Sequence, residues 1–362
     1  MEETKQIEYY EGFNLRSLFS YGPDPFIICV YHNDVDGIVS KFNIGKHFNL
    51  TQSIPADYNK TIKFDTNYYN SIITTRPKIA FVVDFCLHEE EYDLLIESGF
   101  KIVVIDHHTD GRINILKQNK YQNDIIYLFS DQFSAAMLTA YYVTCIGLNR
   151  DVNPIDKSKN TILNLIQIYV SQHRYRFLKL VDARDRGIKT NNDYPTYLHT
   201  YFKSFKFSEN SIYKVYKSRI LLNDALTIGH EIYMTEISEI TNEINKTNWN
   251  IVKTTKDGQN SCSLLQIEPT KSLNATNALA VANKIQIEQN KPSFDGVIVQ
   301  YHSERMSKVY NLPVYHVEIR MNDNNEMHMG EFLKDVCDIS GGGHKNAAGG
   351  DLFSTTLDEV FK

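Results

Sequence analysis

The sequence of 362 residues is poor in the features that mark secreted and membrane proteins. Its five cysteines are widely spaced and odd in number, without a Cys-x-x-Cys pair, which argues against a disulfide framework and a cysteine-ligated zinc site. No apolar run approaches the length of a membrane span, so we expect no membrane contact. The first residues, MEETKQIEYYEGF, are acidic where a secretion signal would be basic and then apolar. These absences predict a cytoplasmic protein.

An excess of basic residues is also absent. The chain has 38 Lys and Arg against 44 Asp and Glu, which gives a formal net charge of -6. Non-specific affinity for a phosphate backbone comes mainly from clustered Lys and Arg, so the composition argues against a protein that grips a long duplex. A short anionic substrate is still compatible with this charge, because bound divalent metals would reverse its sign locally.

What the sequence does contain is the pattern of an α/β protein. The first half alternates apolar runs with helical segments, and such continuous apolar runs are typical of a parallel sheet covered by helices on both faces. In sheets of this kind, ligands bind beyond the carboxyl ends of the strands. The expected strands are 26–32, 78–85 and 101–108, and the expected helices are 37–48, 87–99, 134–148 and 161–185, the last with a break left open.

A second α/β domain is expected after residue 247, since a chain of this length usually forms two cores. Residues 211–246 have apolar positions at helical spacing and predict a long connecting helix that Gly229 interrupts. The predicted domains are 1–205, a helical linker over 206–247, and a smaller α/β domain over 248–362. Its expected strands are 249–254, 261–267, 295–301 and 314–320, around a helix at 276–289.

Carboxylates and imidazoles follow each of the first three apolar runs. Alone, the stretch YHNDVDGIVS (31–40) is explained by a polar turn that Gly37 closes. Three buried strands that deliver such groups to one edge would create strong like-charge repulsion, which a bound cation relieves. Mixed carboxylate and imidazole ligands suit manganese, iron, cobalt or zinc better than calcium, and several carboxylates favour two ions with a bridging ligand. The residues are His32, Asp34 and Asp36 after the first run, Asp84 (the candidate bridge) after the second, and Asp106, His107 and His108 after the third.

In this order, HNDVDG (32–37), VVDF (82–85), DHH (106–108) and LVDARD (180–185) resemble the motifs of the DHH phosphoesterase superfamily. The resemblance implies hydrolysis of a phosphodiester with two divalent metal ions, manganese being the favoured ion. His108 would face the substrate phosphate and Asp106 would orient a ligating histidine. One ion would be held by His32, Asp34 and Asp84, and the other by Asp36, Asp84, His107 and Asp182.

Two features of the motifs leave alternatives open. Only one residue separates His32 from Asp34, where several small-substrate members have three, and RecJ-type members have an aspartate at the comparable place. In the fourth motif both Asp182 and Asp185 are available. We favour Asp182 because it follows the apolar stretch LKLV.

The string SGGGHKNAAGG (340–350) resembles the substrate-binding domain that accompanies many DHH phosphodiesterases and RecJ-type exonucleases. A glycine run lets backbone N–H groups approach an anion, and a guanidinium can bond two phosphate oxygens. A flexible glycine loop, and a surface ion pair for Arg320, are the structural alternatives. The resemblance implies substrate contacts from Arg320, Gly341, Gly342, Gly343, His344 and Lys345.

These motifs predict a hydrolase that degrades short oligonucleotides as an exonuclease, with a short single-stranded oligonucleotide or a dinucleotide as substrate. A cyclic dinucleotide phosphodiesterase and a non-catalytic nucleotide-binding protein are the alternatives. The complete ligand set argues against the second, since a binding module need not keep a two-metal cluster. The choice between RNA and DNA, the cleavage polarity and the formation of a homodimer are left open.

Overall fold

The computed structural model describes two compact units, Met1–Ile232 and Tyr233–Lys362, which are treated separately below. The residues whose structure is described are 7–20, 24–57, 60–72, 76–108, 116, 119–154, 157–246, 249–256, 260–269, 273–322, 328–344, 347–354, 356 and 360–361. The division falls inside the helix α11 (Arg219–Lys246). The domain limits at 205 and 247 stay predictions.

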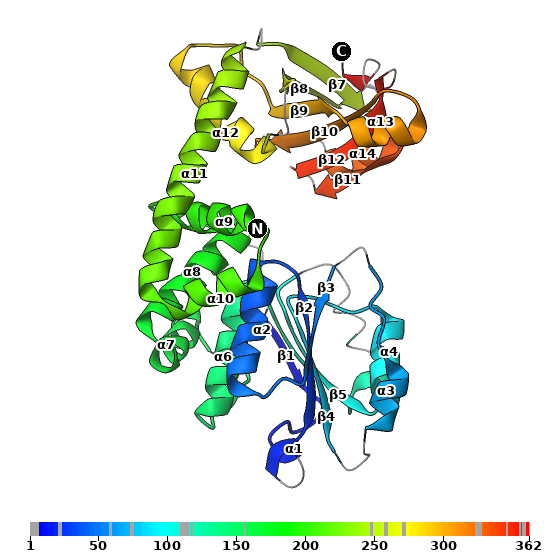
Figure 1. Ribbon diagram of the computed structural model, residues 1–362, viewed down its shortest axis with the longest axis vertical. Helices are drawn as coiled ribbons and strands as arrows, with labels where there is room; N and C mark the ends of the chain where they lie inside the picture. Colours follow the sequence, from blue (N-terminus) through cyan, green and yellow to red (C-terminus); the bar gives the residue numbers. More distant parts are fainter. Residues whose placement is uncertain are drawn as a thin grey trace. The chain divides into compact units, whose positions relative to one another are not determined.

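The first unit is built on a mostly parallel sheet with the strand order β1-β6-β5-β4-β2-β3 (Figure 1). β1 runs antiparallel to β6, and the other pairings are parallel. The register places Tyr31 beside Val83 and Val83 beside Ile105, so three neighbouring strands end at the same level. The strands are β1 (Ile7–Glu11), β2 (Phe26–His32), β3 (Gln52–Ala56), β4 (Lys78–Val83), β5 (Phe100–Asp106) and β6 (Ile125–Ser130).

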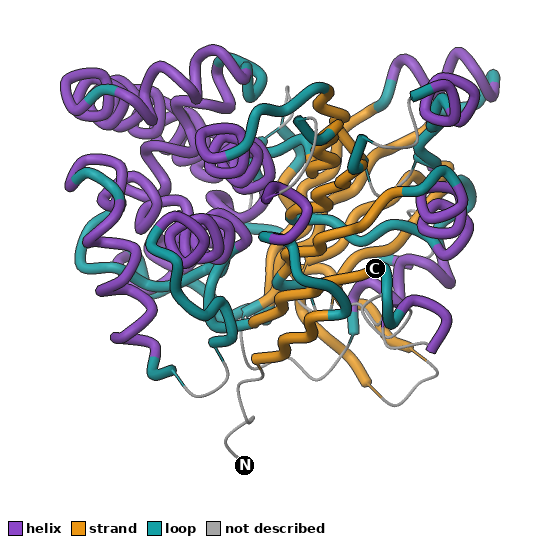
Figure 2. The backbone as a smooth tube through the Cα atoms, turned by 90° about the horizontal axis from the view of Figure 1, so that it is seen from below, coloured by secondary structure: helices purple, strands orange, loops and turns teal. Residues whose placement is uncertain are grey.

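Helices cover both faces of this sheet (Figure 2). Alternate residues of a strand point to opposite faces, and in β2 the side chains of Ile27 and Cys29 join one core while Ile28 and Val30 join the other. The first core includes residues of α2 (Val35–His47), α6 (Ala135–Gly147), α7 (Lys159–Tyr169), α8 (Gln172–Asp185), α9 (Tyr194–Ser204) and α10 (Glu209–Lys217), and the second includes residues of α3 (Thr66–Ser71) and α4 (Glu89–Glu97). The short elements α1 (Ser17–Ser20) and η1 (Asn119–Tyr121) complete the unit.

The second unit contains a sheet with the order β11-β12-β10-β9-β8-β7. Its pairings are antiparallel except for the parallel pair β8 and β9. α12 packs on one face with Val297 and Val299, and α14 packs on the other with Val317 and Ile319. The elements are β7 (Ile251–Lys256), β8 (Asn260–Ile267), α12 (Ala275–Glu288), β9 (Gly296–His302), α13 (Glu304–Tyr310), β10 (Val314–Met321), α14 (Met329–Val336), β11 (Ser340–His344) and β12 (Ala347–Phe353).

The predicted α/β fold class is confirmed. The predicted interruption of a helix at Gly229 is wrong, whereas the helix expected over 161–185 is interrupted. The segment 161–185 forms two helices that separate at Val170 and Ser171. Helix α11 starts at Arg219 and continues through Gly229 without a break. A Cβ at Gly229 would lie 2.0 Å from the carbonyl oxygen of Tyr197, so this glycine allows α9 to pack closely against α11.

The glycine-rich string is also not the loop that the sequence suggests. It forms two paired antiparallel strands, β11 and β12, in which Gly341 lies opposite Gly350 and Gly342 opposite Gly349. A Cβ at Gly341 would lie 2.2 Å from the carbonyl oxygen of Leu333 in α14. The close packing of this helix against β11 therefore requires a residue without a side chain at that position.

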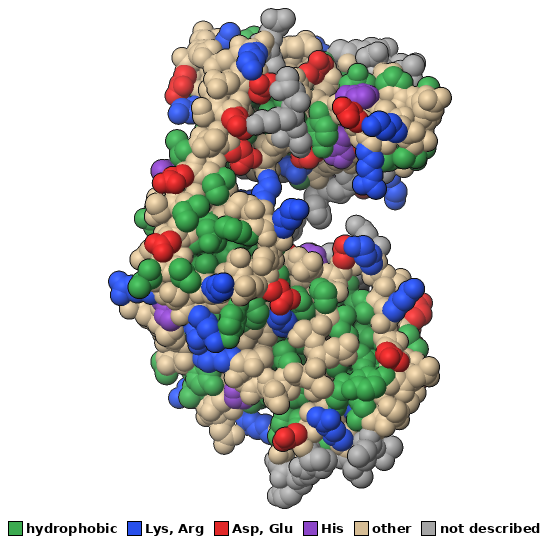
Figure 3. Space-filling view, in the orientation of Figure 1, with side chains coloured by type: hydrophobic (Ala, Val, Ile, Leu, Met, Phe, Trp, Pro, Cys, Tyr) green, Lys and Arg blue, Asp and Glu red, His purple; other side chains and the backbone are tan. Residues whose placement is uncertain are grey.

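Two surface features bear on possible partners. Among the described residues, none of the helices is both long and apolar enough to cross a membrane. On the face drawn in Figure 3, the described Lys and Arg side chains are scattered among acidic and uncharged ones.

Candidate metal centre

The ends of β2, β4 and β5 bring the predicted carboxylates and imidazoles together at one edge of the first sheet. Asp84 directly follows β4 and is only 1% exposed. Its backbone N–H donates to the carbonyl oxygen of Ile105, with N and O 3.0 Å apart, and its φ of 54° lies in the left-handed region. Few residues other than glycine adopt this conformation, and such strained residues cluster at functional sites. The backbone conformation of Asp84 is therefore one that is typical of a functional site.

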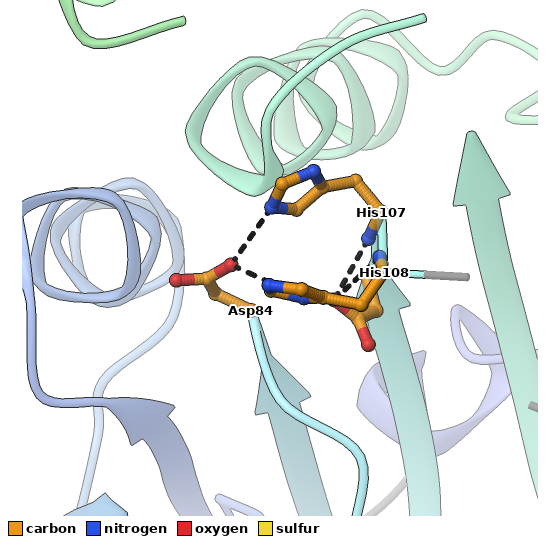
Figure 4. Close-up of side chains that lie close together, drawn as sticks. Asp84, His107 and His108 are labelled. Atoms are coloured by element: carbon orange, nitrogen blue, oxygen red, sulfur yellow. Dashed lines mark hydrogen bonds and ion pairs between the residues drawn. The ribbon is translucent and has the colours of Figure 1, made fainter. Parts of the chain in front are cut away.

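The two carboxylate oxygens of Asp84 face different imidazoles. Oδ2 lies 3.8 Å from Nδ1 of His32. Oδ1 lies 3.2 Å from Nε2 of His107 and 3.9 Å from Nδ1 of His108. Figure 4 shows the two rings of the DHH motif turned toward Asp84. This arrangement is the one expected of a carboxylate between two ions.

The first group of donors consists of His32, Asp34 and Asp84, whose ligand atoms all lie within 4.8 Å of one another. Asp34 caps α2 by accepting a hydrogen bond from the N–H of Gly37, and its other oxygen lies 3.2 Å from Nδ1 of His32. A Cβ at Gly37 would lie 2.1 Å from the carbonyl oxygen of His32, so glycine is needed for the helix to start this close to the strand. Burial alone would lower the pKa of His32, but the carboxylates of Asp34 and Asp84 raise it to about 10.

The second group consists of Asp36, His107 and Asp185, again within 4.8 Å. Nε2 of His107 lies 3.2 Å from Asp185 and 3.8 Å from Asp36, and this buried nitrogen makes no hydrogen bond to any residue that the structure describes. The Asp36 carboxylate accepts hydrogen bonds from the N–H groups of the first two residues of α6, at 2.8 and 3.0 Å. Burial, together with the charges of Asp84 and Asp185, raises the pKa of Asp36 well above its usual range. Without a cation, this negative charge is costly.

Asp106 holds His108 in place. One oxygen of its carboxylate lies 2.8 Å from Nδ1 of His108 and accepts the backbone N–H of His107 at 2.7 Å. The other oxygen accepts a hydrogen bond from Sγ of Cys86 at 3.2 Å. Burial would raise the pKa of Asp106, but the bond to His108 lowers it. Conversely, burial would lower the pKa of His108, and Asp106 raises it to about 9.

Of the two aspartates in the fourth motif, the structure groups Asp185, and not the favoured Asp182, with Asp36 and His107. Both residues lie on α8, three positions apart and thus on the same side of the helix. The carboxylate of Asp182 accepts the N–H of Ser134 at 2.6 Å and pairs with Arg186 at 3.5 Å. Asp182 therefore supports the start of α6, while Asp185 lies beside His107. Because Asp182 and Asp185 share one helix face, the apolar stretch before Asp182 does not indicate which of the two lies closer to the cluster.

Cys86 belongs to the site although no sequence motif pointed to it. It directly follows the VVDF motif and is buried, as Cys29 and Cys145 are. Its hydrogen bond to Asp106 depends on how the segment after β4 packs against β5, which spacing does not reveal.

In the second unit, Arg320 and the glycine run occupy strands of the same sheet, on either side of β12. Nε of Arg320 donates to Oγ1 of Thr276 at 3.1 Å, and the side chain is 27% exposed. Gly341, Gly342, Gly343 and His344 lie in β11, the last strand of the sheet among the described residues, whereas Lys345 lies outside the described residues. An edge strand leaves alternate backbone N–H groups unpaired, so β11 is compatible with anion binding.

The donors of the first unit fit divalent cations. The groups at the sheet edge comprise five carboxylates and three imidazoles, namely Asp34, Asp36, Asp84, Asp106, Asp185, His32, His107 and His108. Mixed oxygen and imidazole donors suit manganese, iron, cobalt or zinc. The buried Nε2 of His107 finds no hydrogen-bond partner in the described part of the chain although two carboxylates approach it, so it has the environment of a ligand atom.

No protein-family model matches the sequence, and no curated protein matches it. Among solved structures, the chain is similar to the DHH domain of a member of a family of ribosomal proteins, with 14% identity over 95% of this chain and 86% of that one (TM-score 0.47). It is also similar to the pGpG-specific phosphodiesterase PggH from Vibrio cholerae, with 12% identity over 92% and 95% (TM-score 0.48). RecJ from Thermus thermophilus, in complex with Mn²⁺, is 13% identical over 93% and 51% (TM-score 0.46).

Proposed function

We propose that the chain is a metal-dependent phosphodiesterase that hydrolyses short oligonucleotides as an exonuclease at a centre for two divalent cations. The observation that carries this proposal is the position of Asp84, whose two oxygens face separate groups of donors. His32 and Asp34 would hold one cation together with Asp84. Asp36, Asp84, His107 and Asp185 would hold the other, and manganese is the ion we favour for this mixed donor set.

A divalent pair, when bound, supplies an acidified water as nucleophile and positive charge for the phosphoryl oxygens. The protein contributes orientation. Asp106 fixes the ring of His108, which we assign to a hydrogen bond with a phosphoryl oxygen of the substrate. Asp36 is held by the N-terminus of α6, so its donor oxygens do not have to reorganise when the cation binds.

Two features support a short substrate. The net charge is -6, and the basic side chains seen in Figure 3 are scattered, which does not suit a long duplex. In the second unit, we assign Arg320 and the edge strand β11, including His344, to contacts with substrate phosphates, together with Lys345. This division gives the metals to one unit and the capture of the substrate end to the other.

A direct test measures bound metal and turnover on the same preparation. We expect manganese-dependent release of mononucleotides from RNA or DNA of two to five nucleotides, and its loss with a chelator. Cyclic dinucleotides serve as the competing substrate class. Preferential hydrolysis of the cyclic compounds would replace the exonuclease assignment. The absence of hydrolysis of any diester by fully metal-loaded protein would overturn the phosphodiesterase proposal.

A further inference from the structure

A pocket of about 250 Å³ adjoins the metal centre within the first unit. One wall consists of the candidate ligands Asp34, Asp36 and Asp185. The rest comes mainly from α8, α9 and the segment after α9, which lie on one side of the sheet (Figure 1). The pocket is thus within reach of a group covalently attached to a phosphate at the metal centre.

The walls away from the carboxylates are largely apolar. Leu198 and Phe202 are buried, and the half-buried Phe207 lies against the ring of His199 with the two centroids 5.3 Å apart. Phe207 has a φ of 51°, and the preceding Lys206 has a φ of 50°. The N–H of Phe207 donates to the carbonyl oxygen of Phe202 at 3.0 Å, which fixes this conformation. Two consecutive left-handed residues that are not glycine are strained, and strain of this kind is found at ligand sites.

Two further polar residues line the pocket besides the three carboxylates. His199 and Arg184 line it, and Arg184 is exposed. Burial lowers the pKa of His199 to about 4, and the positive charges of Arg184 and Lys203 add to this effect. The imidazole is therefore neutral near pH 7 and offers one hydrogen-bond donor and one acceptor. Such a side chain matches the polar edge of a heterocycle better than it matches an anionic phosphate.

We propose that this pocket binds the nucleobase of the nucleotide whose phosphate lies at the metal centre, with Phe207 as the aromatic contact and His199 as the hydrogen-bonding group. The inference rests on the proposed function. The volume is below the roughly 300–1,000 Å³ of pockets that enclose a drug-sized ligand, so it suits one ring system rather than a whole dinucleotide. A phosphate or sugar alone would leave the aromatic and aliphatic walls in contact with polar atoms.

The test compares equilibrium binding of AMP, GMP, CMP and UMP with that of ribose 5-phosphate to the full, manganese-loaded chain. Ribose 5-phosphate keeps the sugar and phosphate but lacks the base. Because stacking of a base on an aromatic side chain has a large effect on affinity, we expect at least one mononucleotide to bind about tenfold more tightly than ribose 5-phosphate. Phe207→Ala and His199→Ala should each reduce this ratio.

Phe205→Ala is the matched control. Phe205 lies on the same segment, is 48% exposed, contacts Tyr201 and is not one of the described residues that line the pocket. It should leave the affinity ratio unchanged, and thermal melting will show that each variant is folded. Equal affinities for mononucleotides and ribose 5-phosphate, or equal effects of the two phenylalanine variants, would overturn the base pocket.

These outcomes are separable from the fate of the proposed function. Base-dependent binding that responds to Phe207→Ala, in a protein that hydrolyses no diester, would retain the pocket and remove the phosphodiesterase. Hydrolysis of oligonucleotides without base-dependent binding would retain the enzyme and remove the pocket.

Discussion

The two sheets carry their polar side chains in different places. In the first sheet, the carboxylates and imidazoles lie beyond the ends of parallel strands, and Asp36, Asp84 and Asp106 are at most 2% exposed. In the second sheet, His316, Glu318 and Arg320 lie on alternate positions of β10, and their side chains are 27–29% exposed. These three carboxylates are therefore more strongly desolvated than the charged groups on β10.

The difference extends to charge balance. On β10, Nδ1 of His316 bonds Asp351 at 2.8 Å, and a guanidinium nitrogen of Arg320 lies 4.0 Å from Glu318. These groups compensate one another. At the first sheet edge, by contrast, burial and the charge of Asp34 raise the pKa of Asp84 well above its usual range. The three imidazoles of this cluster do not fully neutralise its five carboxylates, and such an excess of buried negative charge favours bound cations.

The largest expected effect follows from removing charge at the centre of the first cluster. Asn is tolerated at positive φ, so Asp84→Asn preserves the backbone while it removes the carboxylate. We expect loss of bound metal and a fall in turnover of more than about 100-fold, since removal of groups that merely support a ligand already costs about 10–100-fold. Elemental analysis alongside turnover is the measurement.

The control for this variant is Glu318→Gln on the second sheet, which should leave the metal content unchanged. Full metal occupancy in Asp84→Asn would contradict the bridging assignment. Metal binding would then depend no more on Asp84 than on Glu318.

Asp84→Asn should have opposite effects on thermal stability in metal-free and in metal-loaded protein. In metal-free protein, Asp84→Asn eliminates a buried carboxylate whose ionised form is disfavoured, so we expect a melting temperature about 2–4 °C above wild type, the shift that corresponds to about 1 kcal/mol. With metal, wild type should be the more stable, because ligand binding to the folded state stabilises it. If wild type melts at a higher temperature than Asp84→Asn both with and without metal, the cation does not act by relieving repulsion between carboxylates.

A smaller effect should separate the two aspartates of α8. Asp185→Asn should weaken metal binding by about 10–100-fold, the range seen when metal sites lose a supporting interaction. Asp182→Asn weakens the acceptor for the N–H of Ser134, so it should lower the melting temperature with little change in metal affinity. Metal titration and thermal melting of both variants test this. The reverse pattern would restore Asp182 as the ligand.

The site residues at the strand ends could be predicted from the sequence, but the site residue on helix α8 could not. His32, Asp84 and Asp106 were predictable because buried parallel strands appear as apolar runs, and the next polar residue must lie at the sheet edge. Asp185 was not, because the choice between residues on one helix face depends on how α8 packs. The paired strands of the glycine run depend on α14, whose approach only the structure shows.

The second sheet should affect substrate capture and not metal binding. Arg320→Ala removes a charged hydrogen-bond donor, so we expect about tenfold lower kcat/KM on a dinucleotide, with unchanged metal content. The loss should be smaller on bis(p-nitrophenyl) phosphate, which lacks the extended end that Arg320 is proposed to hold. Loss of metal in this variant would show that the division between the two sheets is wrong.

The smallest expected effect concerns the support beneath the first cluster. Cys86→Ala removes the hydrogen bond from the Cys86 thiol to Asp106, which in turn orients His108, so we expect kcat to fall about two- to tenfold, as for loss of one weak hydrogen bond. Cys29→Ala is the matched control, because Cys29 is equally buried in β2 and its removal leaves a similar cavity. Both variants should lose some stability, but only Cys86→Ala should lower kcat, and Cys86→Ser should restore part of it. Equal losses of kcat in the two alanine variants would mean that packing, and not the hydrogen bond from Cys86, is what kcat depends on. The Asp106 carboxylate would then be oriented by its hydrogen bond from the backbone N–H of His107 without a contribution from the Cys86 thiol.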